Sequence, residues 1–117
     1  MKNRHFTRVD YSVGASIKFG NLVAICNTVN VSLNGLYLKT DQKIAVGTPV
    51  NITVYLSSHA SLKVRGCVVR KDADGICVQI NSLDNNSFER LRAIVAENGA
   101  GQGEVTQEEC GTLRYAC

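Results

Sequence analysis

Apolar and polar side chains alternate with a period of two along most of this 117-residue chain, and this alternation constrains the fold more than any other feature. The pattern predicts β-strands that bury one face. The connections between the alternating runs have the length of turns, whereas parallel pairing needs crossovers of a dozen or more residues. We therefore expect the strands to pair antiparallel. The predicted strands cover residues 13–19, 22–29, 36–39, 50–56, 62–71 and 76–80.

Six short strands with one apolar face each close most economically into a small barrel or sandwich. Gly20-Asn21 and residues 72–75 have the composition of tight hairpin turns. Gly66 interrupts the longest strand and is expected to mark a bulge or a close approach of two backbones. The fold class is therefore predicted to be mainly β.

A single helix is predicted after the last strand. Asn86 is the expected N-cap, with Glu89 three residues later in a variant of the capping box, and Asn98-Gly99 is the expected end. We expect the apolar face of this helix to lie against the barrel or to plug one end of it. That face consists of Phe88, Leu91, Ile94 and Val95.

The periodic pattern ends near residue 97, which sets the predicted domain boundary. Residues 1–97 are expected to form one domain, of a size common for independently folding units. Residues 98–117 are rich in Gly, Gln and Glu and are expected to form a flexible tail. The single alternative kept for the tail is a short strand added to a neighbouring edge.

The net charge of +3 is too small for a dedicated polyanion binder. Residues 1–97 nevertheless contain 12 Lys and Arg against 7 Asp and Glu, a balance that suits an anionic ligand. No segment approaches the roughly 20 apolar residues of a membrane span, and the charged N-terminus lacks the apolar stretch of a secretory signal. We therefore expect a cytoplasmic protein.

The five cysteines do not have the spacing of a metal site or of a disulfide framework. Cys26, Cys67 and Cys77 each lie in runs of Val and Ile, where cysteine usually behaves as a small buried hydrophobe. There is no C-x-x-C pair, and neither histidine lies near a cysteine at ligand spacing. Reduced, mostly buried thiols are the expectation.

Arg4 and Arg8 form an R-x-x-x-R pattern just before the first predicted strand. Each guanidinium offers five donors in a planar fork that matches phosphate oxygens and the O6/N7 edge of guanine, and its flat face stacks on bases. Two arginines at this spacing are suited to hold one nucleotide from different sides. By itself the pattern is also typical of a solvated basic N-terminus.

A second pattern, N-x-S-x-x-G, lies between two predicted strands and comprises Asn30, Ser32 and Gly35. Short Asn and Ser side chains cap turn amides or bind the edge of a ligand, and glycine tolerates a positive φ. Alone, this pattern is equally typical of an ordinary turn. The order of the two patterns is more specific than either one.

R-x-x-x-R, a strand pair of about 20 residues and then [D/N]-x-S-x-x-G resemble the signature of the PilZ family of cyclic di-GMP receptors. The resemblance covers roughly residues 4–96. It includes the L-Y-L strand after Gly35, the G-T-P-V entry to the next strand, the G-C-V-V-R strand, the D-G-I-C-V-Q-I return and the closing helix. The resemblance implies a six-stranded antiparallel barrel of the split-barrel type with one C-terminal helix.

The resemblance also implies roles for five residues. Arg4 and Arg8 would bind the phosphates and guanine of cyclic di-GMP on a segment that wraps over the ligand. Asn30 and Ser32 would bind guanine or a nearby phosphate from the barrel surface, and Gly35 would set the turn. Asn30 replaces the more common Asp, so no carboxylate faces the guanine N1 and N2 donors.

The resulting hypothesis is a cyclic di-GMP receptor that relays the signal by conformational change to a partner protein, as a monomer or homodimer. No cofactor and no metal are expected. The alternatives are a barrel that binds single-stranded nucleic acid and a PilZ-like scaffold without a ligand. An enzyme is not expected, because His5 and His59 have no acid or nucleophile partner at a readable spacing.

Overall fold

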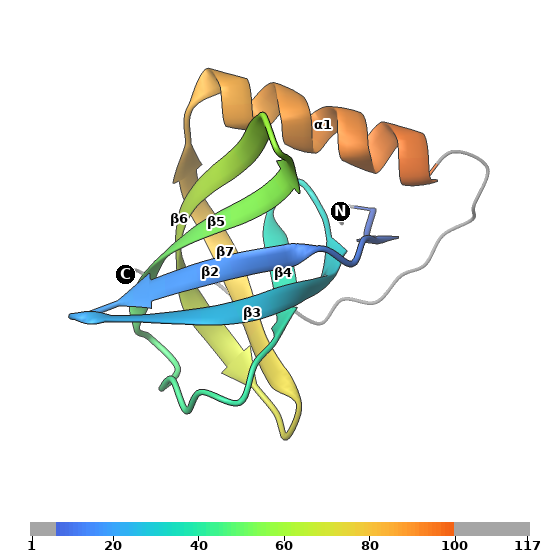
Figure 1. Cartoon of the computed structure of the whole chain (residues 1–117). Helices are drawn as coiled ribbons and strands as arrows, with labels where there is room; N and C mark the ends of the chain where they lie inside the picture. Colours follow the sequence, from blue (N-terminus) through green and yellow to red (C-terminus); the bar gives the residue numbers. More distant parts are fainter. Residues whose placement is uncertain (1–6, 100–117) are drawn as a thin grey trace.

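The structure is a computed structural model that describes residues 7–99. It contains seven strands and one helix within that range, arranged as a barrel with the helix across one end (Figure 1). The elements are β1 (Val9–Asp10), β2 (Gly14–Phe19), β3 (Leu22–Val31), β4 (Gly35–Lys39), β5 (Pro49–Ser57), β6 (Ala60–Lys71), β7 (Gly75–Leu83) and α1 (Asn85–Gly99).

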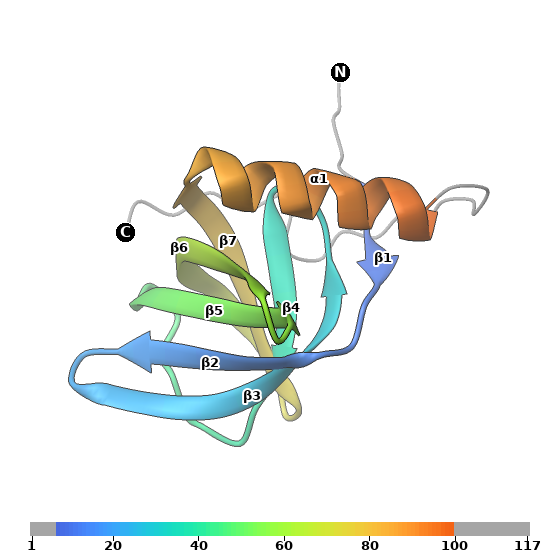
Figure 2. The ribbon, with the colours of Figure 1, turned by 45° about the horizontal axis from the view of Figure 1, so that its top comes forward.

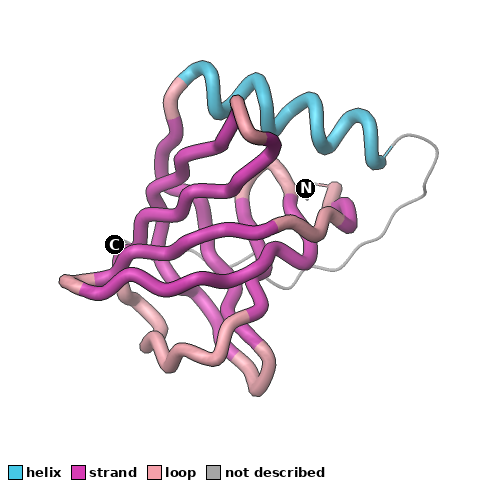
Figure 3. Tube along the Cα trace, in the orientation of Figure 1, coloured by secondary structure: helices cyan, strands magenta, loops and turns pink. Residues whose placement is uncertain are grey.

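Six strands form the closed barrel in the order β3-β2-β5-β6-β7-β4, and pairing of β4 with β3 completes the ring. Every pair is antiparallel (Figure 3). Because the barrel is closed, every barrel strand is hydrogen-bonded to a neighbour on both sides along at least part of its length. Few sheet edges are therefore left unpaired. The predicted six-stranded antiparallel barrel with a C-terminal helix is thus confirmed.

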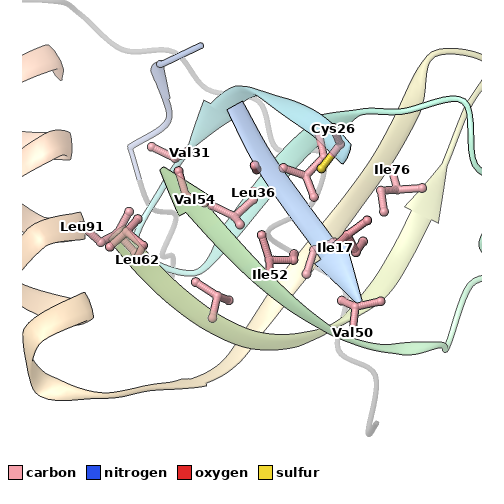
Figure 4. Packing of buried hydrophobic residues seen from close by; sticks show 14 of the residues in the cluster. Ile17, Cys26, Val31, Leu36, Val50, Ile52, Val54, Leu62, Ile76 and Leu91 are labelled. Carbon is pink, nitrogen blue, oxygen red and sulfur yellow. The ribbon is translucent and has the colours of Figure 1, made fainter. Parts of the chain in front are cut away.

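Because side chains alternate between the two faces of a strand, every second side chain lies inside the barrel. The inner side chains meet those of α1 at one end and Ile44, from the β4–β5 loop, contributes to the same core (Figure 4). Each fully buried aliphatic side chain contributes about 1.5–3 kcal/mol to stability. The largest are Ile17, Leu36, Leu38, Ile44, Ile52, Leu62, Ile76 and Leu91.

Helix α1 lies across one end of the barrel and packs against β6 and β1 (Figure 2). Its N-cap is Asp84, whose carboxylate accepts the Ser87 N–H at 2.8 Å, so the prediction of Asn86 was wrong by two residues. Ser87 is buried, and its hydroxyl accepts the Lys63 N–H of β6 at 2.9 Å. This bond ties the first turn of the helix to the barrel.

The buried stripe of α1 also differs from the predicted one. Leu91 and Ile94 are buried and Val95 is half-buried, but Phe88 is exposed. Ser87 takes its place in the stripe because positions 87, 91 and 94 follow the i, i+4, i+7 spacing of one helix face. Within the described residues, no helix is long and apolar enough to cross a membrane.

Two strand boundaries change the description of the N-terminal half. Strand β1 was not predicted, because two residues are too few to show a period; it pairs with the end of β3. Strand β3 continues through Val31, so Asn30 lies in a strand rather than in a turn. Helix α1 runs past the predicted boundary at residue 97, and residues 100–117 of the predicted tail lie outside the described residues.

The three cysteines of the barrel are buried, as predicted. Cys26 and Cys77 are not disulfide-bonded, and burial raises the pKa of Cys26 to about 11. Cys67 is disulfide-bonded, so the expectation of reduced thiols is wrong at this residue.

Gly66 is a point of close backbone approach, as its place in the sequence predicted. The β6–β7 register shifts between Arg65 and Gly66. A Cβ atom at Gly66 would lie 2.1 Å from the backbone oxygen of Gln79 and 2.9 Å from Val78 Cγ1. Gly14, at the start of β2, has nothing within 4 Å of a Cβ and no positive φ.

We predict that Gly66→Ala lowers the free energy of unfolding by at least about 2 kcal/mol, because the backbone of β7 must move to admit the methyl group. Gly14→Ala is the matched control and should remain within about 1 kcal/mol of wild type. Urea denaturation followed by circular dichroism measures both values. Equal stabilities for the two variants would show that the β6–β7 approach is not a constraint.

Candidate functional site

Arg8 is held against the end of β3 by a hydrogen bond from its Nη1 to Asn30 Oδ1 at 2.6 Å. Strand β1 places it there, because Asp10 pairs with Asn30 and Val9 with Val31. Since arginine only donates, Asn30 must present its carbonyl oxygen to Arg8 and keeps its amide N–H groups for another partner. Arg4 lies outside the described residues.

A buried threonine holds the segment that follows β1 in place. Thr28 Oγ1 donates to the carbonyl oxygen of Tyr11 and accepts the N–H of Val13 at 2.9 Å. Thr28 is 1% exposed, and the β3–β4 register shifts between Thr28 and Asn30. The N-terminal segment is therefore fixed to β3 on both sides of the β-bulge, which positions Arg8.

The turn after β3 is organised by the hydroxyl of Ser32. Ser32 Oγ accepts the N–H groups of Asn34 at 3.2 Å and of Gly35 at 3.1 Å, and it lies 3.1 Å from Asn34 Oδ1. The Ser32 N–H donates to the Gly35 carbonyl at 2.9 Å. With a side chain that is 1% exposed, Ser32 here acts on the shape of the turn.

Gly35 is buried and begins β4, where it pairs with Gln79 of β7. Gly35 does not use the positive φ that glycine tolerates: among the described glycines, positive φ values occur at Gly20 (61°) and Gly47 (94°). The turn is joined to β7 by the Ile80 N–H, which donates to the Asn34 carbonyl at 2.9 Å. The residue of β4 that lies next to β7 at this point therefore has no side chain.

A row of outward side chains crosses the sheet beside this turn. Asn30 of β3 is opposite Tyr37 of β4, Tyr37 is opposite Cys77 of β7, and Cys77 is opposite Arg70 of β6. With strands about 4.8 Å apart, the row spans roughly 14 Å. An apolar cluster of Cys67, Val69 and Cys77, with Tyr37 packed against it, forms the centre of this outer face.

Tyr37 is bound to the β6–β7 turn. Its hydroxyl donates to both carboxylate oxygens of Asp72, at 2.8 and 2.9 Å. This bond is the main reason why the pKa of Asp72 lies below its ordinary value. Burial, assisted by Asp72, raises the pKa of Tyr37 to about 12. Tyr37 is therefore a neutral hydrogen-bond donor at physiological pH. The positive charge along this row comes from Arg70 and from Arg8, which is bonded to Asn30.

Two hollows of about 490 and 450 Å³ lie elsewhere, over β5, β6 and β7, and share Asn51 and Arg65 as lining residues. Neither hollow is lined by a residue of the R-x-x-x-R motif or of the N-x-S-x-x-G motif. The motif residues that the structure describes lie instead beside β1, at the end of β3, in the turn after it and at the start of β4.

The fold and the site define a class of protein: a small antiparallel barrel that holds an arginine segment against a short turn at the end of a strand. The family model of the PilZ domain matches residues 2–97 of the chain. The chain therefore belongs to the PilZ domain family, as its motifs indicated.

Solved structures agree on the fold. The PilZ domain of YcgR from Escherichia coli with c-di-GMP superposes with a TM-score of 0.62 at 14% identity, covering 83% of this chain and 92% of that one. The PilZ domain of CeSA from a cellulose-synthesising bacterium gives 0.59 at 20% identity, covering 77% and 95%. The Bacillus subtilis inhibitor of motility MotI/DgrA gives 0.71 at 10% identity and 88% coverage of this chain, which spans 54% of that protein. No curated protein sequence matches the chain.

The structure brings Arg8 and Asn30 together and places Ser32 and Gly35 in the adjoining turn. Sequence reasoning considered Arg70 as an electrostatic aid but favoured an ordinary exposed strand-end arginine. It missed Tyr37 and Gln79, because cross-strand neighbours are set by register. The one signal for Gln79 in the sequence is a polar side chain at an outward position directly after the apolar run 76–78.

We predict that Tyr37→Phe raises the pKa of Asp72 toward its ordinary value of 3.8, because the variant removes the hydroxyl that stabilises the carboxylate. A carboxyl whose pKa is depressed by folding stabilises the fold above its unfolded pKa and loses that contribution as the pH falls through the folded pKa. The variant should therefore lose less stability than wild type below pH 3.8.

Carbon-detected NMR titration of the Asp72 carboxyl tests this prediction directly. Tyr55→Phe is the control, because the Tyr55 hydroxyl lies 3.1 Å from Ser16 Oγ and does not contact a carboxylate. An unchanged Asp72 pKa in Tyr37→Phe would contradict the assigned bond.

Proposed function

We propose that this chain is a receptor for cyclic di-GMP and acts by binding rather than by catalysis. The observation that carries the proposal is the bond between Arg8 and Asn30, which fixes one motif against the other at 2.6 Å. Family membership supports the ligand, since the PilZ domain of YcgR was solved with c-di-GMP.

The donor set suits a cyclic dinucleotide with two phosphates. Arg8 uses Nη1 for Asn30, and its Nη2 is buried without a partner, so one arm of the guanidinium is free for an anionic oxygen. Arg4, four residues earlier, would approach the ligand from the other side. Arg70 adds a second positive charge at the far end of the row.

The structure offers a route by which ligand binding would reach a partner protein. Val9 of β1 is buried in the core, and β1 packs against α1. A ligand bound by Arg8 would therefore stabilise β1 and the part of α1 that packs against it. We propose that this surface of β1 and α1 is presented to a downstream protein in the cytoplasm, by a monomer or a homodimer.

A single-stranded nucleic-acid binder would need aromatic side chains in a row on one face. Among residues 7–99 the exposed aromatics are Tyr55 of β5 and Phe88 of α1, on different elements, and the Tyr37 hydroxyl is bound to Asp72. Titration with a labelled oligonucleotide at two salt concentrations tests this alternative. Tight binding that weakens steeply with salt would favour it over a cyclic di-GMP receptor.

We predict that wild-type protein binds cyclic di-GMP in isothermal titration calorimetry and that Arg4→Ala and Arg8→Ala each weaken binding by about 1.5–3 kcal/mol, the value of one charge-assisted hydrogen bond. This corresponds to a rise in Kd of roughly 10- to 150-fold. Calorimetry also gives the stoichiometry, which separates one bound dinucleotide from an intercalated pair.

Arg92→Ala is the matched control, because Arg92 is an exposed arginine on α1 whose described partner is Glu89. Its Kd should equal that of wild type. The proposed function would be contradicted if wild-type protein gave no binding heat with cyclic di-GMP, or if the Kd were unchanged in both motif variants.

A further inference from the structure

Gln79 has an unusual environment beside the motif turn. Among the described residues, the buried side-chain atoms without a hydrogen-bond partner are Arg8 Nη2 and Gln79 Oε1. One is a donor and the other is an acceptor, and Asn30 and the turn 32–35 lie between them in the sheet. Buried polar groups are nearly always paired in folded proteins, so each of these two atoms is a candidate for contact with a ligand.

The register of the strands places Gln79 at this site. Gln79 pairs with Gly35 on one side and with Cys67 on the other. Its neighbours Val78 and Ile80 face the barrel core, so the Gln79 side chain projects from the outer face, beside the apolar cluster. Gly35, the partner of Gln79 on β4, has no side chain, and a glycine within a strand often marks a place where a ligand or another backbone comes close to the sheet.

We propose that Gln79 is a base-contacting residue, whose Oε1 accepts a hydrogen bond from the N1–H or 2-amino group of a guanine seated over Gly35. This inference rests on the proposed function and specifies how the base is held. Asn30 Oδ1 already accepts one bond from Arg8, and position 30 carries no carboxylate, so a second acceptor would serve the two guanine donors N1–H and N2–H. Gln79 Oε1 is a free acceptor close to the turn.

The test uses Gln79→Leu, which keeps most of the volume and removes the amide. The Kd for cyclic di-GMP should rise about tenfold by calorimetry, the effect of one hydrogen bond to a buried acceptor. The Tm without ligand should equal or exceed that of wild type, because an unpaired buried acceptor has been removed. A residue with a purely structural role would instead lower the Tm.

Gln42→Leu makes the same chemical change on the exposed β4–β5 loop and should alter neither quantity. Wild-type binding together with an unchanged Kd in Gln79→Leu would overturn the assignment of Gln79 alone. A lowered Tm in Gln79→Leu would also overturn it, because the loss of affinity would then follow from damage to the fold. A wild-type protein that binds no cyclic di-GMP would overturn the proposed function as well.

Discussion

The pairing of β3 with β4 is the constraint on which the rest of the structure depends, because it closes the barrel and places the two motifs side by side. Strand β3 pairs with β2 along its first half and with β4 and β1 along its second half. The change of partner coincides with the β-bulge between Thr28 and Asn30, and bulges bend a strand and increase its twist. Without this bend the N-terminal segment would not lie beside the turn.

Most of the barrel could be predicted from the sequence because each strand buries one face, and burial imposes a period of two. Where a different interaction sets the structure, prediction failed. Strand β1 is fixed by its pairing with β3 rather than by its own pattern. The helix N-cap is Asp84 because its carboxylate reaches the Ser87 N–H, and buried Ser87 binds Lys63 of β6. That tertiary bond turns α1 so that Phe88 is exposed.

The residues of the candidate site also divide into those that the sequence predicted and those that it did not. Local spacing was sufficient to select Arg8, Asn30, Ser32 and Gly35, because a motif is a short-range pattern. Ser32 is buried and makes the bonds to turn amides that its motif allows. The place of Gly35, opposite Gln79 and without a positive φ, depends on a contact between strands that no local pattern contains. Tyr37, Arg70 and Gln79 join the site through strand register, and a shift of one residue would turn them to the other face.

The unpaired atoms of Arg8 and Gln79 link stability to binding at this surface. An unsatisfied buried polar group costs about 1–3 kcal/mol, so the ligand-free fold carries a local penalty at the place where the motifs meet. In the proposed complex, a guanine nucleotide that supplies an acceptor to Arg8 and a donor to Gln79 would remove that penalty on binding. The ligand would then stabilise the folded chain by more than its own contact area suggests, because groups that are unpaired without it become paired. A site of this kind selects its ligand by chemistry, since a base without matching donors leaves the Gln79 acceptor unpaired.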